Sequence, residues 1–412
     1  MGKIVRILYV GQYFPPEVGA PPIRAVETVA HLHREGHDVV VLTGFPNYPT
    51  GVIAPDYRGR WFVREVIDGI PTLRCYLTAS PRKTLWNRLL NYVSYVVSSA
   101  VMGTFFLRGP FDVVIGTSPP LFVGISAWWL SVRHRARFVF DVRDVWPEAP
   151  ETMGEIRNPI VLRTMRWIAD FLYWRAALIT CANPGNDRVI ADRLGSAGAK
   201  VTVVANGSNT QVFRPLTSDE RCEVRSEVGV EAPFLAVYVG QHGLMYDLDV
   251  LVDVAAQFEG DTGIEFLFVG DGPTKPKLQR QASELSNIRF LPPHDAQDAA
   301  RIVGAADVGL VSIRDVPFLR MVVPVKLYDY LACGIPVIHN CGGAAQQFVQ
   351  ESACGLDFPS RDVQALSDQI QRLRANPHER AAMGERGRRV IESRFSREAQ
   401  GARFAYLLSE LS

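Results

Sequence analysis

Two successive series of short apolar runs constrain the fold of this chain more than any other feature. The first series has runs at 4–10, 39–42, 111–115, 138–142 and 178–180. The pattern restarts further along, with runs at 234–239, 264–269, 288–291, 308–312 and 336–339. Helical segments separate the runs, and strands that alternate with helices predict parallel sheets covered on both faces. We therefore expect two doubly wound, Rossmann-like α/β domains.

The chain has 412 residues, which suits two hydrophobic cores. We expect an N-terminal domain over 1–207 and a second domain over 208–385, because the stretch from about 208 to 233 is polar and irregular. One long charged helix is expected from 377 to 411, and its segment 386–412 is expected to return to the first domain. Open parallel sheets bind ligands at the carboxyl ends of their strands. We thus expect the two domains to face each other across a cleft.

Composition excludes several classes of protein. The 44 basic and 43 acidic residues give a net charge of +1, which argues against nucleic acid as the main partner. The six cysteines form no CxxC pair and no cluster with histidine, so we expect reduced cytosolic thiols and no metal site. The N-terminal residues lack the long apolar region of a secretory signal.

Seven motifs follow one another along almost the whole chain. They are YFPPEVGAPPIRA at 13–25, GHDVVVLTGFPNYPTG at 36–51, FDVRDVWPE at 140–148, ANGSNTQVF at 205–213, YVGQHG at 238–243, VGDGP at 269–273 and PVKLYDYLACGIPVI at 324–338. In this order and spacing, the chain resembles the retaining GT-B glycosyltransferases of family four, especially the bacterial branch that builds O-antigen, capsule and exopolysaccharide. The resemblance implies the GT-B fold, a nucleoside diphosphate sugar donor, no metal or other cofactor, and retention at the anomeric carbon.

The donor site of this family is expected to use backbone N–H groups and cations against the diphosphate. Gly19 and Ala20 stand just before a helix, where glycine lets the backbone approach an anion. Lys326 and Arg320 are the candidate catalytic cations, although either could be a solvated surface charge. Asp329 takes the place of a family glutamate that accepts hydrogen bonds from ribose, and a surface acid is the alternative. The resemblance adds further donor-side residues, namely Gly240, Gln241, His242, Gly272, Pro273 and Leu327.

Two departures from the wider family affect this assignment. Met321 stands where most relatives have a second glutamate, and the stretch from Gln241 to Tyr246 lacks the usual arginine and lysine. The polysaccharide branch carries the Pro-x-Lys segment instead. Our hypothesis is that Lys326, together with Arg320, stabilises the departing diphosphate.

The first domain supplies candidates near the reacting sugar. Arg143 stands where many relatives have a histidine, and with Asp144 it is a candidate catalytic residue that could hydrogen-bond a sugar or phosphate. A purely structural Asp–Arg pair is the alternative. Position and resemblance assign five residues to the acceptor side: Arg24, Asn47, Tyr48, Asp141 and Trp146.

The segment from 89 to 107 contains no charged residue, and basic residues flank it. Three arrangements are open: a buried helix, a helix with one face on a membrane, and a membrane span. Asn91, Ser94 and Ser98 fall on one stripe of this helix, opposite the apolar stripe of Leu90, Val93, Val97 and Val101. A second aromatic and basic stretch, from Trp128 to Arg137, suits an anionic bilayer surface.

These observations favour a cytoplasmic glycosyltransferase, peripheral on the inner face of the cell membrane. Its expected substrates are a nucleotide-sugar, with uridine implied by the resemblance, and a lipid-diphosphate-linked or saccharide acceptor. Two other functions remain open. One is a nucleotide-sugar epimerase of the same architecture, with Asp141, Asp144, His242 and His339 as acid–base candidates. The other is a scaffold that binds nucleotide-sugar without turnover.

Overall fold

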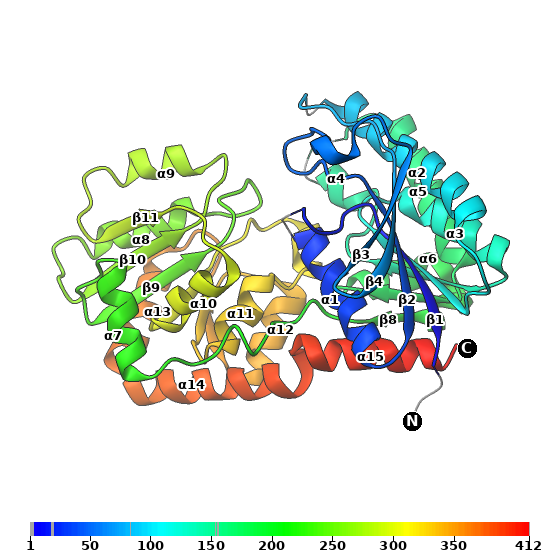
Figure 1. Cartoon of the computed structure of the whole chain (residues 1–412). Coiled ribbons are helices and arrows are strands. Elements are labelled where there is room, and N and C mark those ends of the chain that lie inside the picture. The colour runs from blue at the N-terminus through cyan, green and yellow to red at the C-terminus, as the bar shows by residue number, and fades with distance from the viewer. Residues whose placement is uncertain (1–3, 18–19, 83, 153, 155, 412) are drawn as a thin grey trace. The chain divides into compact units, whose positions relative to one another are not determined.

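A computed structural model describes the chain except for residues 1–3, 18–19, 83, 153, 155 and 412. The chain forms two compact units (Figure 1). The first, here the N-terminal domain, comprises Met1–Ala205 and Gln400–Ser412, and the second, the C-terminal domain, comprises Asn206–Ala399.

The N-terminal domain is built on a sheet in the order β3-β4-β2-β1-β5-β6-β7-β8. The strands are β1 Arg6–Val10, β2 Asp38–Gly44, β3 Phe62–Ile67, β4 Ile70–Cys75, β5 Val113–Ser118, β6 Arg137–Val142, β7 Leu178–Cys181 and β8 Val201–Val203. Among the described strands, only β3 runs antiparallel to its neighbour. The helices are α1 Ala20–Arg34, α2 Leu85–Phe106, α3 Val123–His134, α4 Glu148–Thr152, α5 Pro159–Arg175, α6 Asn186–Leu194 and α15 Arg397–Ser409.

The C-terminal domain has a fully parallel sheet in the order β11-β10-β9-β12-β13-β14. Its strands are β9 Phe234–Val239, β10 Ile264–Val269, β11 Ile288–Leu291, β12 Val308–Val311, β13 Val337–His339 and β14 Gly355–Asp357. Its helices are α7 Ser218–Glu227, α8 Asp249–Gln257, α9 Lys275–Gln281, α10 Ala296–Gly304, α11 Val325–Ala332, α12 Gly343–Ser352, α13 Val363–Ala375 and α14 Pro377–Val390. The two doubly wound α/β sheets confirm the predicted fold class.

The C-terminal segment differs from the single long helix that we expected. A π-helical turn at Ile391–Phe395 separates α14 from α15, and the return to the N-terminal domain begins at 400, not at 386. Close packing explains why α14 stays with the C-terminal domain, since a Cβ on Gly384 would lie 2.0 Å from the carbonyl oxygen of Gly334. On α15, Gln400 Oε1 accepts the backbone N–H of Ala205 at 2.7 Å.

Helix α2 is not the buried helix that was one of the three expectations. The segment Trp86–Phe106 is long and apolar enough to cross a membrane, yet only 17% of its apolar window is buried. Its polar stripe points inward, because Asn91 Nδ2 donates to the Thr78 carbonyl at 2.6 Å and Ser94 Oγ accepts the N–H of Thr78 at 2.9 Å. Its apolar stripe is therefore left on the surface, where Val97 is 57% exposed.

Candidate functional site

Two glycine loops meet at the carboxyl ends of β9 and β10. Gly240 and Gly270 have φ values of +139° and +136°, a region that favours glycine. A Cβ on Gly270 would lie 2.0 Å from the carbonyl oxygen of Gly240, and one on Gly272 would lie 2.3 Å from that of His242. Glycine is thus required at these positions for the loops to touch. The contact brings together the predicted donor residues of the two loops, with Gln241 and Pro273 exposed.

Lys326 lies in the first turn of α11 and reaches this loop pair. Its side chain is 9% exposed, and Nζ lies 3.6 Å from the ring centre of Tyr238 and 4.0 Å from that of Tyr246. Nζ has no hydrogen-bond partner in the described part of the chain. A Cβ on Gly240 would be 2.9 Å from Nζ, so glycine gives the ammonium its space. Burial lowers the pKa of Lys326 well below its ordinary value.

The other residues predicted around α11 have different surroundings. Asp329 Oδ1 accepts a hydrogen bond from Ser208 Oγ at 2.6 Å. Arg320 is exposed and forms a two-bond ion pair with Asp315, at 2.9 and 3.0 Å. Leu327 is fully buried, and its N–H donates to the Pro324 carbonyl. The charge of Asp329 acts on Lys326 and opposes the lowering of its pKa.

His242 is fully buried beneath the first glycine loop. Its ring contacts those of Tyr238, Phe268 and Phe290, and neither ring nitrogen has a hydrogen-bond partner in the described residues. Burial, followed by the charges of Lys275 and Lys326, lowers its pKa to about 4. The imidazole is therefore neutral near pH 7 and supports the loop through packing.

In the N-terminal domain, Asp141 at the end of β6 is held by three side chains. Its carboxylate accepts hydrogen bonds from Thr180 Oγ1 at 2.8 Å, Thr117 Oγ1 at 3.1 Å and Arg24 at 3.3 Å. Arg24 also donates to the Val204 carbonyl at 3.1 Å. This arrangement ties β5, β6, β7 and α1 together, and it makes Asp141 an anchor for Arg24.

Arg143 and Asp144 follow the same strand. Burial lowers the pKa of Arg143, as does the nearby Arg24, whereas Asp141 and Asp144 oppose that shift. Burial raises the pKa of Asp144, and Arg143 opposes it. The two charges thus stabilise each other in a poorly solvated place. Trp146 is half-buried and packs on the core of this domain.

Asn47 and Tyr48 line a cavity of about 350 Å³ within the N-terminal domain. Its other lining residues include Tyr13, Arg82, Asn87, Arg88, Asn91 and Tyr92. Tyr48 is 48% exposed and packs edge-on against Tyr13, with ring centres 5.7 Å apart. Aromatic faces beside amide groups are suited to binding a polar organic ligand such as a saccharide.

Sequence reasoning missed the residue that shapes this cavity. Glu17 is 6% exposed, and its carboxylate accepts the N–H groups of Asn47 at 2.9 Å, Tyr48 at 2.8 Å and Phe14 at 3.3 Å. Burial raises its pKa, and these hydrogen bonds oppose the shift. An isolated Glu within a loop gives no pattern from which such a role could be found. Tyr238 on β9 and Tyr246 in the loop before α8 were also missed, because apolar patterning does not tell a ring that contacts Lys326 from one that packs in the core.

Gly19 lies outside the described residues, and Ala20 begins α1. Across the described ranges, no group of three or more His, Cys, Asp or Glu side chains could hold a metal ion.

Comparisons with known proteins find two domain families. Residues 19–207 match the glycosyl transferase 4-like domain, and residues 233–376 match glycosyl transferases group 1. WcaI of Escherichia coli K12, named as a colanic acid biosynthesis glycosyl transferase, is 25% identical over 80% of this chain and 82% of its own length. A GDP-mannose-dependent mannosyltransferase of Corynebacterium glutamicum is 30% identical, and the match covers 49% of this chain and 54% of that protein, about half its length.

Solved structures extend the comparison to the whole chain. Anabaena HepE in complex with UDP superposes with a TM-score of 0.72 at 16% identity, covering 98% of this chain and all of that chain. WaaG, a glycosyltransferase involved in lipopolysaccharide biosynthesis, superposes with a TM-score of 0.65 at 14% identity, covering 98% and 99%. These similarities confirm the predicted GT-B fold.

Proposed function

We propose that this chain, which matches a glycosyl transferase 4-like domain and glycosyl transferases group 1, transfers a sugar from a nucleoside diphosphate sugar to a saccharide or lipid-diphosphate-linked acceptor in bacterial surface polysaccharide synthesis. The donor is a UDP-sugar, and the anomeric configuration is retained. Relatives named for colanic acid, teichuronic acid and lipopolysaccharide core biosynthesis support the polysaccharide role. The UDP complexes of HepE support the choice of base.

The unpartnered ammonium of Lys326 carries this proposal. A buried cation without an acceptor is unfavourable, so its retention needs an anion that arrives later. The diphosphate of a donor supplies oxygen atoms for that purpose, and Gly240 has no Cβ that would crowd Nζ. As the bond to the anomeric carbon breaks, negative charge grows on the leaving diphosphate, and a charged Lys326 stabilises it.

The roles of the other residues follow from their surroundings. Backbone N–H groups of the glycine loops assist Lys326, and the reaction needs no metal. Asp329, whose Oδ1 accepts a hydrogen bond from Ser208 Oγ, binds the donor ribose through its carboxylate. Asn47 and Tyr48 bind the acceptor in the 350 Å³ cavity. Arg143 and Asp144 orient the sugar through hydrogen bonds, and the proposed reaction uses no covalent nucleophile from the protein.

A membrane surface is the third element of the proposal. The outer faces of α2, α3 and α5 expose apolar side chains, namely Trp86, Leu90, Val93, Val97, Val101, Phe105, Trp129, Val132, Ile160, Trp167 and Trp174. The helices are neighbours, since Trp129 Nε1 donates to Thr104 Oγ1 at 3.0 Å and Trp128 packs against Phe171. Exposed arginines, including Arg82, Arg133 and Arg163, flank these side chains. Such a surface fits the interface of an anionic bilayer, on the cytoplasmic side.

A donor panel tests the catalytic proposal. Purified protein is incubated with UDP-sugars and a lipid-diphosphate saccharide, and the products are resolved by mass spectrometry and NMR. Lys326→Ala is expected to lower turnover by about 10²-fold or more, whereas Lys277→Ala, on an exposed lysine paired with Asp249, is expected to have no effect. Near wild-type turnover in Lys326→Ala would contradict the proposal. Donor isomerisation without acceptor would identify an epimerase, and tight binding without turnover a scaffold.

Liposome flotation tests the membrane surface separately. We expect the protein to float with anionic vesicles and a Val97→Ser/Phe105→Ser variant to remain in the dense fraction. Leu244→Ser is the matched control, because Leu244 is 69% exposed and lies in the C-terminal domain. Equal flotation of all three proteins, or of none, would show that this face does not bind membranes.

A further inference from the structure

A second cavity lies in the C-terminal domain, at the other edge of its sheet from the glycine loops. Its volume is about 640 Å³. Its lining includes Asp307, just before β12, and Gly334–Pro336, just before β13. The sheet is parallel, so strand starts gather at one edge, whereas Gly240 and Gly270 follow strand ends at the other. The cavity is therefore separate from the proposed donor site.

Basic side chains dominate the charged lining of this cavity. Helices α7 and α14 contribute four arginines, which are Arg221, Arg380, Arg388 and Arg389. The acidic side chains in the lining are Asp307 and Glu385. A concave surface with this imbalance attracts anions.

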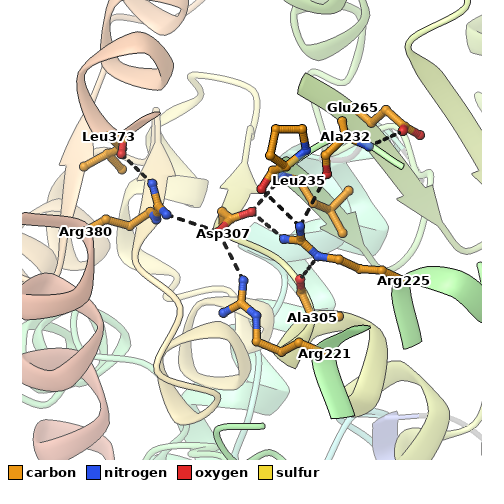
Figure 2. A network of polar contacts seen from close by, with 10 residues as sticks. Arg221, Arg225, Ala232, Leu235, Glu265, Ala305, Asp307, Leu373 and Arg380 are labelled. Atoms are coloured by element: carbon orange, nitrogen blue, oxygen red, sulfur yellow. Dashed lines mark hydrogen bonds and ion pairs between the residues drawn. The ribbon is translucent and has the colours of Figure 1, made fainter. Parts of the chain in front are cut away.

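Asp307 is shared by three guanidinium groups, as Figure 2 shows. Its side chain is 6% exposed, and it accepts contacts from Arg225 at 2.5 Å, Arg221 at 3.1 Å and Arg380 at 3.3 Å. It also accepts the backbone N–H of Leu235 at 2.8 Å. One carboxylate thus pairs with three guanidinium groups, and the cluster of Asp307 with these arginines has a net positive charge.

A purely structural network around Asp307 would need fewer arginines. Arg225 already binds the carboxylate and also donates to the carbonyls of Ala305, Ala232 and Pro233. By contrast, the Arg221 guanidinium donates to Asp307 alone among the described residues, and this side chain is 31% exposed at the cavity. Burial lowers the pKa of Arg221, as do Arg225 and Arg380, whereas Asp307 opposes that shift. An anion in the cavity would relieve this repulsion.

Arg389 completes the arrangement. It lies on α14, is exposed at the cavity, and its guanidinium has no partner within the described residues. Arg221, Arg380 and Arg389 therefore offer N–H donors from two helices to one cavity, and guanidinium groups match phosphate oxygens two at a time. The cavity volume falls within the range of about 300–1,000 Å³ that holds small organic ligands.

We propose that this cavity binds a small phosphorylated anion through Arg221, Arg380 and Arg389, at a site distinct from the donor site. The shared chemistry is a phosphoryl group, which free pyrophosphate, a sugar phosphate or a nucleotide could supply. Binding would join α7 to α14 through the ligand.

Calorimetric titration of the full chain with inorganic pyrophosphate tests the proposal. The protein carries Lys326→Gln, so that donor-site binding is weakened, and the test reads binding without any transfer reaction. We expect saturable binding that Arg221→Gln and Arg389→Gln each weaken about tenfold or more. Arg280→Gln, on an exposed arginine of α9 outside the cavity, is expected to leave it unchanged.

Further titrations identify the phosphoryl compound that binds, and one set of results would overturn the proposal. Parallel titrations with glucose 1-phosphate and UMP show which phosphoryl compound binds most tightly in an Arg389-dependent manner. Should Arg221→Gln disturb folding, Arg389→Gln still decides, because its guanidinium has no partner to lose. Absent binding, or binding that Arg389→Gln and Arg280→Gln affect equally, would overturn the proposal. The titration measures binding alone, so a protein that fails to transfer a sugar would still give a valid result for this cavity.

Discussion

Replacing Lys326 with methionine should stabilise the C-terminal domain while removing its affinity for a nucleotide. Lys326 is 9% exposed, and its buried ammonium has no hydrogen-bond partner among the described residues and lies against the rings of Tyr238 and Tyr246. Removing an ammonium from water costs several kcal/mol of free energy, and a desolvated cation–π contact with an aromatic ring offsets about 2 kcal/mol of that cost. Methionine fills similar space without charge. We expect Lys326→Met to raise the free energy of unfolding by about 1–3 kcal/mol.

The pH dependence gives this prediction a sign. Because burial lowers the pKa of Lys326, the unfolded chain binds more protons than the folded chain between that lowered pKa and the ordinary value of about 10.4. The stability of the wild-type protein therefore rises with pH across this window, relative to Lys326→Met. The advantage of the variant is fully present below the window and fades as the pH rises through it.

Differential scanning calorimetry measures the effect. All seven tryptophans lie in the N-terminal domain, so tryptophan fluorescence identifies the unfolding transition of that domain. The remaining calorimetric transition then belongs to the C-terminal domain. A gain of 1 kcal/mol should raise the midpoint temperature of this C-terminal transition by roughly 2–4 °C. UDP should raise it further in the wild type but not in the variant. Lys277→Met, on a lysine that is 62% exposed, should change stability by less than about 0.5 kcal/mol.

Two results would refute the reasoning about Lys326. A variant less stable than the wild type at every pH would mean that the tyrosine rings already compensate the buried ammonium. Unchanged stabilisation of Lys326→Met by UDP would mean that the cation does not face the diphosphate.

Three further perturbations test other parts of the C-terminal domain. Gly270→Ala should destabilise it by about 2 kcal/mol or more, measured by urea denaturation, because the new Cβ would strike the carbonyl of Gly240; Gly260→Ala, with open space around it, should cost less. Burial lowers the pKa of His339 to about 4, so the free energy of unfolding should fall by up to about 3 kcal/mol from pH 6.5 to 4, and His339→Asn should remove that part of the slope. Asp307→Asn should cost about 3–5 kcal/mol by leaving three arginines uncompensated; a loss below 1 kcal/mol would contradict the network.

The sequence predicted the buried strands well, because both faces of each strand are covered and their apolar runs are continuous. It missed the three-residue edge strands β8 and β14. It also missed β3 and β4, which form an antiparallel hairpin at the edge of the N-terminal sheet. Arg64 and Glu65 interrupt the apolar pattern there, and Glu65 pairs with the buried Arg74. Edge strands with such polar residues lack the pattern from which the central strands were found.

The candidate site was predictable only where a motif fixes the backbone. Gly240, Gly270 and Gly272 stand in short loops after strands, and their positions follow from the strand pattern and the resemblance. The surroundings of Lys326 were not predictable, because the two tyrosines that enclose it come from β9 and from the loop before α8. Similarly, the pairing of Arg320 with Asp315 depends on side-chain conformations within the turn that contains Arg320.

Helix α2 shows why periodicity alone could not settle the membrane question. The stripe of Asn91, Ser94 and Ser98 and the opposite apolar stripe are visible in the sequence, yet the usual rule would turn the apolar side inward. The structure reverses it, because Asn91 and Ser94 bond to Thr78, and Ser98 bonds to the carbonyl of Tyr76. A helix held to its domain by polar contacts leaves its apolar face without a protein partner in the described chain. The cavity of Asn47 and Tyr48 is lined by the first turns of the same helix, so a bilayer on that face would place a lipid-linked acceptor beside it.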